Sequence, residues 1–365
     1  MRITAAVLPE LHAEFVVEDV ELEEPRAGEA VVRVVACGVC HTDDITRHGD
    51  LPFPAPGVLG HEGAGVVEAV GAGVTNVAPG DHVVIGWPFC GECRNCADGQ
   101  PRYCLQLGPL VAGGGRLDGS TALARTDGSS LHSHFFGQSA FATHALVRAN
   151  ALVPVAPDLP LELLGPLACG IGTGAGAILN VLRPGLGTSV VVFGVGSVGL
   201  AAVMAAQCTG ATTIVAVDLQ PSRLELAREL GATHAVDARE DPVAAVKEIC
   251  GGLADFSLEC TGNVDVLRLA ADSVGMRGTC AVIGGAPAQA SFTLDHLTTL
   301  WGKRIVGILG GEGQSTQLIG GLIDLYRQGR FPFDRLVTTF PLADINDAFA
   351  AAHDGAVVKP VLSMA

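Results

Sequence analysis

The strongest constraint on the fold of this chain is a glycine motif between an apolar strand and a helix. Gly194, Gly196 and Gly199 form G-x-G-x-x-G directly after Ser189–Phe193, a run typical of a buried strand, and at the start of a helical segment, 197–207. There, backbone amides and the helix N-terminus can hold a pyrophosphate. The motif predicts cofactor contacts from Gly194, Gly196, Ser197, Val198 and Gly199.

The next segment favours NAD over NADP. Asp218 follows the strand segment Thr213–Val217, at the place where a carboxylate accepts hydrogen bonds from the adenosine ribose and repels a 2′-phosphate. Arg223 lies shortly after it and either contacts this ribose or is a solvated helix residue. The alternative is that the glycines only allow close helix–strand packing and that Asp218 caps a turn.

Strand and helix segments continue to alternate further along the chain. Additional strands are predicted at 256–259, 279–283 and 303–307, with a helix at 223–230. This alternation is typical of a doubly wound α/β domain, which we place at 171–307.

Four cysteines are crowded into a stretch rich in Gly, Pro and Asn. Cys90, Cys93, Cys96 and Cys104 are spaced C-x2-C-x2-C-x7-C, and four thiolates this close can surround zinc tetrahedrally. The alternatives are two disulfides, which need an oxidising compartment, or an iron–sulfur cluster, whose bacterial spacing differs after the third Cys. We favour a structural zinc in a lobe at 90–104, whose closed shell leaves no place for a substrate.

A second set of metal donors is dispersed along the chain. Cys40 and His61 lie in Gly-rich turns, and Cys169 follows Pro166-Leu167-Ala168. Together they would make the three-ligand set of a catalytic zinc with one open position, which means Lewis-acid chemistry. Taken singly, each could be an ordinary buried residue.

The remainder of the chain predicts a second, β-rich domain. Short Val-rich segments between Val31 and Val84 suggest a barrel-like arrangement, and polar, Gly-rich 105–139 is expected to be a long surface loop. The closing segment from about Gly310 is expected to carry one amphipathic helix and a short strand and to return to this domain. Its predicted extent is 1–170 with 308–365.

Composition limits the partners. The chain has 365 residues, 48% of them hydrophobic, and a formal net charge of −16, which argues against nucleic-acid or anionic-membrane binding and favours small molecules. We see no signal peptide and no run of bilayer length, and expect a cytoplasmic protein. Of eleven cysteines, six are proposed ligands, and the remaining five are expected to be reduced core thiols.

The assembled motifs resemble the zinc-dependent alcohol dehydrogenases of the medium-chain dehydrogenase/reductase superfamily, over essentially the whole length. The resemblance is carried by Gly38–Asp43, Gly60–Gly65, Pro79–Val83, the four-Cys lobe, Cys169 and Gly194–Gly199. It implies a GroES-like catalytic domain made from both chain ends, a Rossmann domain, an active site between them, two zinc ions per chain and a homodimer or homotetramer.

Several site residues are implied by this resemblance alone. Thr42 would accept the alcohol proton before hydride passes to the nicotinamide, and Asp43 would orient the ligand histidine. Glu62 matches a carboxylate near the metal that can serve as an alternate ligand. His41 and Lys359 match basic positions near the cofactor pyrophosphate.

The sequence departs from the family pattern at one step and resembles one subgroup. Ile45 stands where many members carry a proton-relay histidine, so His48 or solvent would have to take over. The stretch His134–Phe141, together with Phe53, Trp87 and Phe136, resembles the subgroup acting on benzylic and allylic primary alcohols, although these aromatics could be core residues. The alternatives are a thiol-dependent formaldehyde dehydrogenase and a non-catalytic NAD-binding relative.

Overall fold

The computed structural model describes residues 1–364 and divides into two compact units. Unit 1 comprises Met1–Cys169, Gly313–Gly320 and the segment from Asp334 onward, and unit 2 comprises Gly170–Glu312 and Gly321–Phe333. Each unit is described by itself below.

Unit 2 is built on a six-stranded parallel sheet in the order β13-β12-β11-β14-β15-β16. By sequence rank this is 3-2-1-4-5-6, the order of the Rossmann fold, so the predicted doubly wound domain is confirmed. The strands are β11 (Ser189–Phe193), β12 (Thr213–Asp218), β13 (His234–Asp237), β14 (Ala254–Glu259), β15 (Val274–Val282) and β16 (Arg304–Gly307).

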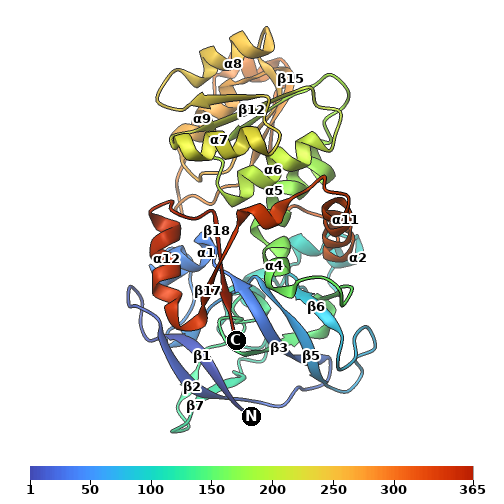
Figure 1. Ribbon diagram of the computed structural model, residues 1–365, viewed down its shortest axis with the longest axis vertical. Helices are drawn as coiled ribbons and strands as arrows, with labels where there is room; N and C mark the ends of the chain where they lie inside the picture. The colour runs from blue at the N-terminus through green and yellow to red at the C-terminus, as the bar shows by residue number, and fades with distance from the viewer. Residues whose placement is uncertain (365) are drawn as a thin grey trace. The chain divides into compact units, whose positions relative to one another are not determined.

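Helices cover both faces of this sheet, with α6 and α7 on one side and α8 on the other (Figure 1). The buried strand β11 and the Ala-rich α6 agree with the sequence prediction, because both are mostly apolar and buried. The helices of this unit are α5 (Gly170–Gly176), α6 (Ser197–Gln207), α7 (Pro221–Glu229), α8 (Pro242–Cys250), α9 (Val264–Asp272) and α10 (His296–Leu300), with the π-helical η5 (Ala177–Leu182). Helix α11 (Ser315–Arg327) begins in unit 1 and ends in unit 2.

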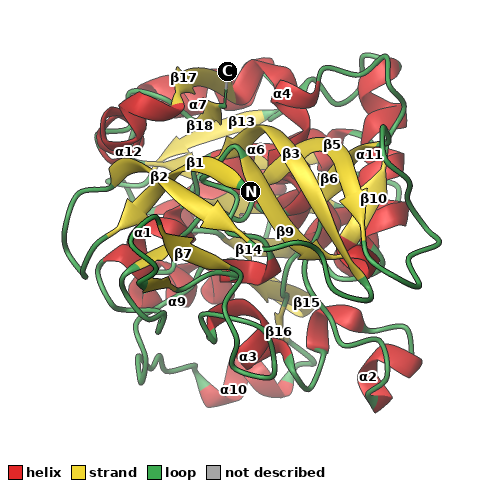
Figure 2. Ribbon diagram, turned by 90° about the horizontal axis from the view of Figure 1, so that it is seen from below, coloured by secondary structure: helices red, strands yellow, loops and turns green. Residues whose placement is uncertain are grey.

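Unit 1 contains the predicted β-rich domain, with two sheets. One has the order β4-β1-β2-β7-β8, and the other β10-β6-β5-β3-β18-β17 with β9 also paired to β3. Strands β3, β5 and β6 lie side by side in Figure 2. The strands are β1 (Arg2–Leu8), β2 (Val16–Leu22), β3 (Glu29–Gly38), β4 (Gly57–Val58), β5 (Gly63–Val70), β6 (His82–Ile85), β7 (Leu123–Arg125), β8 (Ser130–Leu131), β9 (His144–Arg148), β10 (Leu152–Pro154), β17 (Val337–Pro341) and β18 (Lys359–Ser363).

Short helices connect these strands. They are α1 (His41–Arg47), α2 (Arg94–Ala97), η1 (Pro101–Tyr103), α3 (Leu107–Ala112), η2 (Phe135–Gly137), η3 (Ala149–Ala151), α4 (Leu161–Leu164), η4 (Gly165–Ala168), η6 (Phe333–Leu336), η7 (Leu342–Asp344) and α12 (Ile345–His353). Phe333 itself belongs to unit 2. Strand β18 pairs antiparallel with the end of β3, so the late segment does return to the first domain.

Two local expectations are wrong. The stretch 105–139 is not a simple surface loop: it contains α3, β7, β8 and η2, and Leu131 and Phe135 are fully buried. Its polar residues hid this, because several of them are themselves buried and hydrogen-bonded, as Ser133 and Gln138 are. The closing segment also holds two helices and two strands rather than one of each.

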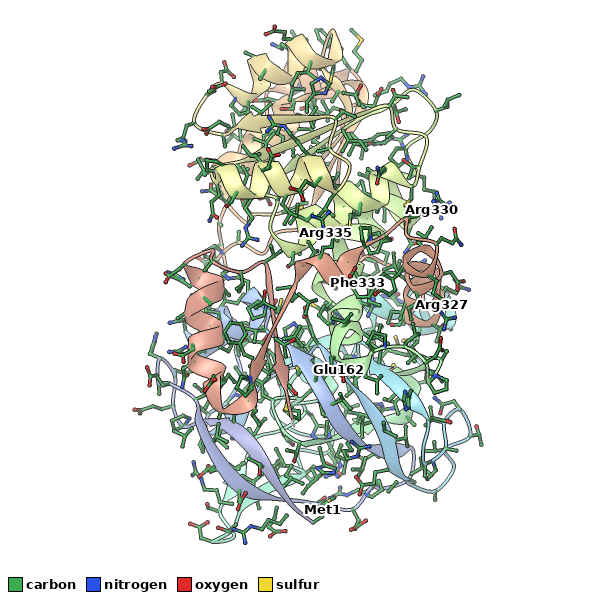
Figure 3. The ribbon with its side chains drawn as sticks, viewed as in Figure 1. Met1, Glu162, Arg327, Arg330, Phe333 and Arg335 are labelled. Carbon is green, nitrogen blue, oxygen red and sulfur yellow. The ribbon has the colours of Figure 1, made fainter. Side chains whose placement is uncertain are left out.

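Gly170 and residues 308–312 and 321–333 cluster with unit 2, whereas the sequence placed 1–170 and all of 308–365 in the first domain. Arg330, labelled in Figure 3, is tied to the end of α6, since the Cys208 thiol donates to its carbonyl at 3.4 Å. The ring of Phe333 lies 4.8 Å from that of Tyr326. The contact between Cys208 and Arg330 joins residues 122 positions apart and leaves no local signal in the sequence.

Among residues 1–364, no single helix has both the length and the hydropathy of a bilayer span. Only a bent pair, Leu161–Ala168 with Gly170–Leu182, meets that test jointly.

Candidate active site and metal centres

The first turn of α1 organises the dispersed donor set. Strand β3 ends at Gly38, and Cys40 is the residue that caps α1. Asp43, three positions on and fully buried, accepts the Cys40 N–H on Oδ2 at 3.0 Å. Its Oδ1 accepts the Gly60 N–H at 3.1 Å and the His61 ring at 2.9 Å. One carboxylate therefore fixes both turns that carry the donors.

This contact also selects the ring nitrogen of His61 that is available for a metal. An ionised carboxylate only accepts hydrogen bonds, so Nδ1 carries the proton and Nε2 presents its lone pair. Within the described residues, Nε2 is buried and has no hydrogen-bond partner. Burial lowers the pKa of His61, but Asp43 and Cys40 together more than offset this and the net shift is upward. A buried orphan nitrogen of this kind fits a metal ligand.

Four donors converge at this point. Ligand atoms of Cys40, His61, Glu62 and Cys169 lie within 4.8 Å of one another, and the last three residues are buried. A hydrogen bond with Cys169, together with the Lys359 cation and His61, lowers the pKa of the Cys40 thiol well below its usual range, against the effect of burial. The set of two thiols and one imidazole fits zinc, and the thiolate form that zinc requires is favoured at Cys40.

Glu62 is held by a cation from the far end of the chain. Lys359 Nζ donates to Glu62 Oε1 at 3.1 Å and to the Val39 carbonyl at 3.0 Å, and both charged side chains are buried. Removing one partner of such a pair costs about 3–5 kcal/mol. Gly38 is required here, because a Cβ at this position would lie 2.0 Å from Glu62 Oε2.

The residues of α1 are divided between this cluster and the surface. Thr42 is half-buried, with Oγ1 3.7 Å from Cys40 Sγ, and is therefore beside the donor set. His41 is exposed, Ile45 is half-buried, and exposed His48 donates from Nδ1 to the Asp44 carbonyl at 2.8 Å. The predicted contacts of His41 and Lys359 with a pyrophosphate remain predictions.

Aromatic side chains gather on His61. Phe136 stacks on its ring at 4.6 Å between centroids, and Trp87 meets Phe136 edge-on at 5.1 Å. Phe53 contacts Phe135, which in turn packs against His61 at 5.5 Å. The aromatics named from sequence are therefore buried and also adjacent to the donor set.

Gln138 was missed by the sequence reasoning. It is buried, its amide donates to the His61 carbonyl at 2.9 Å, and its Oε1 accepts the Gly63 N–H at 3.0 Å. It thereby brackets the His61–Glu62 turn from a segment 75 or more residues away. A buried glutamine in a Gly-rich stretch has no local signature.

The four-Cys lobe forms a compact sulfur cluster. The Sγ atoms of Cys93 and Cys96 are 3.5 Å apart and those of Cys90 and Cys96 are 3.9 Å apart. A tetrahedron with Zn–S bonds of about 2.3 Å has edges of roughly 3.8 Å, so the spacing fits zinc. All eleven cysteines are free thiols, which removes the disulfide alternative in this structure. Backbone N–H groups donate to the sulfurs, from Cys90 to Cys104, from Cys93 to Cys90, from Leu105 to Cys93 and from Gln106 to Cys104.

The glycine motif lies where β11 meets α6. A Cβ at Gly194 would lie 2.4 Å from Thr261 Cγ2, and one at Gly199 would lie 2.0 Å from the Gly194 carbonyl, so packing requires both. At Gly196, which caps α6, an added Cβ would meet nothing within 4 Å. Chain packing does not explain this third glycine, and the open space above the helix N-terminus, where Ser197 and Val198 begin the helix, fits a pyrophosphate.

Asp218 is tied to this motif. Its Oδ2 accepts the Val195 N–H at 2.8 Å and its Oδ1 accepts the Gln220 N–H at 2.9 Å. Arg223 is half-buried, and Asp218 raises the pKa of its guanidinium, although burial lowers it by more.

Comparison with known proteins agrees with this architecture. Residues 26–158 match the alcohol dehydrogenase GroES-like domain and residues 197–326 match the zinc-binding dehydrogenase domain. A geraniol dehydrogenase from Castellaniella defragrans is 44% identical over 98% of this chain and 96% of its own length.

Solved structures superimpose closely. A zinc-binding-domain alcohol dehydrogenase from Burkholderia ambifaria has a TM-score of 0.98 at 49% identity, covering 100% of this chain and 99% of its own. A benzyl alcohol dehydrogenase from Acinetobacter calcoaceticus has a TM-score of 0.97 at 43% identity, covering 100% of both chains.

The fold and the donor sets define a zinc- and nicotinamide-dependent oxidoreductase. The chain belongs to the zinc-dependent alcohol dehydrogenases of the medium-chain dehydrogenase/reductase superfamily.

Proposed function

We propose that this enzyme interconverts aromatic or allylic primary alcohols and their aldehydes, using NAD. The observation that carries the substrate class is the set of aromatic side chains around His61. Phe136 stacks on the imidazole of His61, and Trp87 meets Phe136 edge-on. Planar, apolar substrates gain from burial against such rings. The names of the geraniol and benzyl alcohol dehydrogenase relatives support the same class.

The mechanism uses the donor cluster and its neighbours. Zinc, when bound by Cys40, His61 and Cys169, supplies a Lewis acid that makes an alcohol more acidic. Thr42 Oγ1, beside Cys40, accepts the alcohol proton, and Asp43 holds His61 in its Nδ1–H form. Glu62, balanced by Lys359, is the alternate ligand, and Lys359 limits its freedom to move.

Proton transfer beyond Thr42 follows a route without a histidine at position 45. Ile45 cannot carry a proton, and His48 is exposed one turn further along α1. We propose that solvent or His48 collects the proton. An Ile45→His variant with a pH–rate profile identical to that of the parent would count against any relay at this position.

The substrate proposal is tested by an initial-rate screen. Benzyl alcohol, cinnamyl alcohol and geraniol should give kcat/KM at least about tenfold higher than ethanol, equivalent to about 1.4 kcal/mol. Formaldehyde turnover only in the presence of a thiol would replace this proposal with the thiol-dependent reaction.

The preference for NAD rests on Asp218 at the end of β12. An Asp218→Gly variant should lower the ratio of kcat/KM for NAD over NADP by about tenfold or more, since the repulsion of a 2′-phosphate is lost. Unchanged discrimination would show that Asp218 does not contact the ribose. The roles of Arg223, His41 and Lys359 at the cofactor belong to the same proposal.

Two zinc ions per chain are proposed, one for each donor set. Metal analysis should give about two, whereas a value near one, with the four-Cys lobe alone loaded, would favour a non-catalytic NAD-binding protein.

We also propose self-association as a homodimer or homotetramer in the cytoplasm. Edge strand β16 and the exposed apolar residues Leu297, Leu300 and Trp301 support a second copy as the partner of this surface. Leu300→Asp should reduce the oligomer measured by light scattering, and Leu186→Asp, on an exposed residue elsewhere, should not.

A further inference from the structure

A buried arginine lies behind the aromatic cluster without a carboxylate partner. Arg102, in η1, is 3% exposed, and its Nε has no hydrogen-bond partner within residues 1–364. The guanidinium carbon of Arg102 lies 5.1 Å from the centroid of the Trp87 ring, a contact that attracts the cation but does not provide the Nε–H with an acceptor. Burial lowers the pKa of the Arg102 guanidinium to about 10, and an electrostatic interaction with the Cys169 thiol only partly offsets this effect. A buried charge without a hydrogen-bonded counter-charge is costly, so the site calls for an anion.

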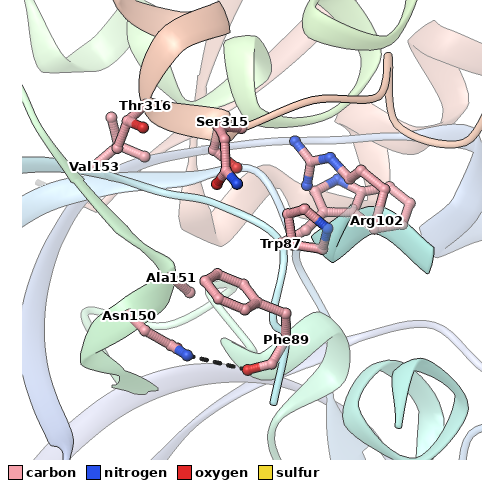
Figure 4. A pocket seen from close by; sticks show the side chains of 10 residues that line it. Trp87, Phe89, Arg102, Asn150, Ala151, Val153, Ser315 and Thr316 are labelled. Atoms are coloured by element: carbon pink, nitrogen blue, oxygen red, sulfur yellow. Dashed lines mark hydrogen bonds between the residues drawn. The ribbon is translucent and has the colours of Figure 1, made fainter. Parts of the chain in front are cut away.

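Other donors face the same space. Arg102, Trp87 and Phe89 form one wall of a cavity of about 40 Å³ that Gln314, Ser315 and Thr316 also line. Figure 4 shows Ser315 and Thr316 on the opposite side of the cavity from Phe89. Trp87 Nε1 is also buried and has no partner among the described residues. The cavity thus has two unpaired N–H donors from side chains of one wall.

The opposite wall is the N-terminus of a long helix. Gln314 precedes α11, and Ser315 and Thr316 are its first two residues, whose N–H groups have no acceptor inside the helix. The aligned peptides place positive potential at this end. The residues that line the cavity include one cation, Arg102, and no carboxylate, although the chain as a whole carries a formal charge of −16.

We propose that this cavity is a binding site for a small carboxylate anion, distinct from the donor set at Cys40, His61 and Cys169. A planar carboxylate matches the guanidinium fork, and its second oxygen can accept from the helix N-terminus or the Trp87 indole. The volume suits a group of the size of formate or acetate. The anion would hold Trp87 in place behind Phe136, which stacks on His61.

Trp87 provides a direct readout, because the chain has only two tryptophans. In a Trp301→Phe background of the zinc-loaded protein, sodium acetate is titrated against sodium chloride at constant ionic strength. Acetate should change the Trp87 emission saturably, with a Kd in the millimolar range, and should raise the thermal midpoint. Chloride should do neither.

Variants separate binding from general ionic effects. Arg102→Met should abolish the saturable change, and Arg94→Met, on an exposed arginine of the same lobe, should retain it. Arg102→Lys keeps the charge but lacks the guanidinium fork, so it should weaken acetate binding about tenfold or more. This variant preserves the fold and provides the test if Arg102→Met does not fold. No saturable change with acetate, an equal change with chloride, or a change retained in both Arg102 variants at parental affinity would overturn the proposal.

Discussion

The two donor clusters of unit 1 are built in opposite ways. The four thiols at Cys90–Cys104 come from one short stretch, three of them half-exposed, and backbone N–H groups orient the sulfurs. The donors at Cys40, His61, Glu62 and Cys169 come from distant segments, and charged side chains orient them from within the core.

The difference separates stability from chemistry. Four identical thiolates close a shell, so a metal there ties a lobe together and meets no substrate. The cluster of Cys40, His61, Glu62 and Cys169 has only three strong zinc donors, because its fourth group, Glu62, is restrained by Lys359. In the function that we propose, the network around Glu62 keeps a coordination position accessible to substrate.

Loss of a donor in the buried cluster should have the largest effect on activity. Cys40→Ser should lower kcat/KM on the order of a thousandfold, because several kcal/mol of Lewis-acid stabilisation are lost. Kinetics and zinc content measured on the same sample test this. Cys250→Ser, on a thiol outside both clusters, is the matched control, and equal losses in both variants would contradict the assignment.

Loss of the Asp43 charge, which orients His61, should have the second-largest effect on activity. Asp43→Asn removes the charge behind His61 and leaves one of three N–H donors without an acceptor. Zinc affinity or kcat/KM should fall about 10–100-fold. Asp44→Asn, on the neighbouring carboxylate paired with His48, should stay near parental values. A parental Asp43→Asn enzyme would show that backbone packing alone orients the ring.

Loss of a thiol from the four-Cys lobe should mainly lower the thermal stability of the protein. Cys93→Ser should remove one zinc and lower the thermal midpoint by several degrees, since the lobe has little apolar core of its own. Calorimetry with and without a chelator measures this. At temperatures below the transition, kcat should fall far less than in Cys40→Ser. A loss of kcat as large as in that variant would break the distinction between the two clusters.

The smallest effect concerns acid sensitivity at His134, which precedes in sequence the aromatic residues that pack on His61. Burial, with help from Arg116, lowers the pKa of His134 to about 4, below the 6.5 of an unfolded histidine. Between these values the unfolded chain binds the extra proton, so stability falls as pH falls. The free energy of unfolding should drop by about 2 kcal/mol from pH 6.5 to 5.

His134→Gln should lose this part of the pH dependence. The thermal midpoint, measured from pH 7 to 5 for both proteins, gives the comparison, with His132→Gln as a neighbouring control. Parallel pH curves for His134→Gln and the parent would mean that His134 titrates normally in the folded state.

The sequence predicted those features that depend on residues close together in the chain. The glycine motif after Ser189–Phe193, and the doubly wound domain predicted around it, depend on periodicity and spacing that short segments display. The four-Cys site could be predicted for the same reason, because every proposed ligand lies within one short lobe.

The contacts that the sequence did not predict join residues far apart in the chain. Gln138 bonding the His61 turn, and Arg330 bonding the end of α6, join residues whose pairing no local pattern encodes. The stretch 105–139 looked like a loop because its buried polar groups are satisfied by partners elsewhere. Ser139, for example, donates to the Val58 carbonyl.

The ion pair between Glu62 and Lys359 spans 297 residues and sets an order of events during synthesis. When the four-Cys lobe has emerged from the ribosome, all of its thiols are available to capture metal. Glu62 at that moment still lacks its counter-charge, and β3 lacks the strand β18 that brings it. If both clusters hold zinc as we propose, the buried cluster is completed last, and a nascent chain can bind its first metal long before it is able to turn over substrate.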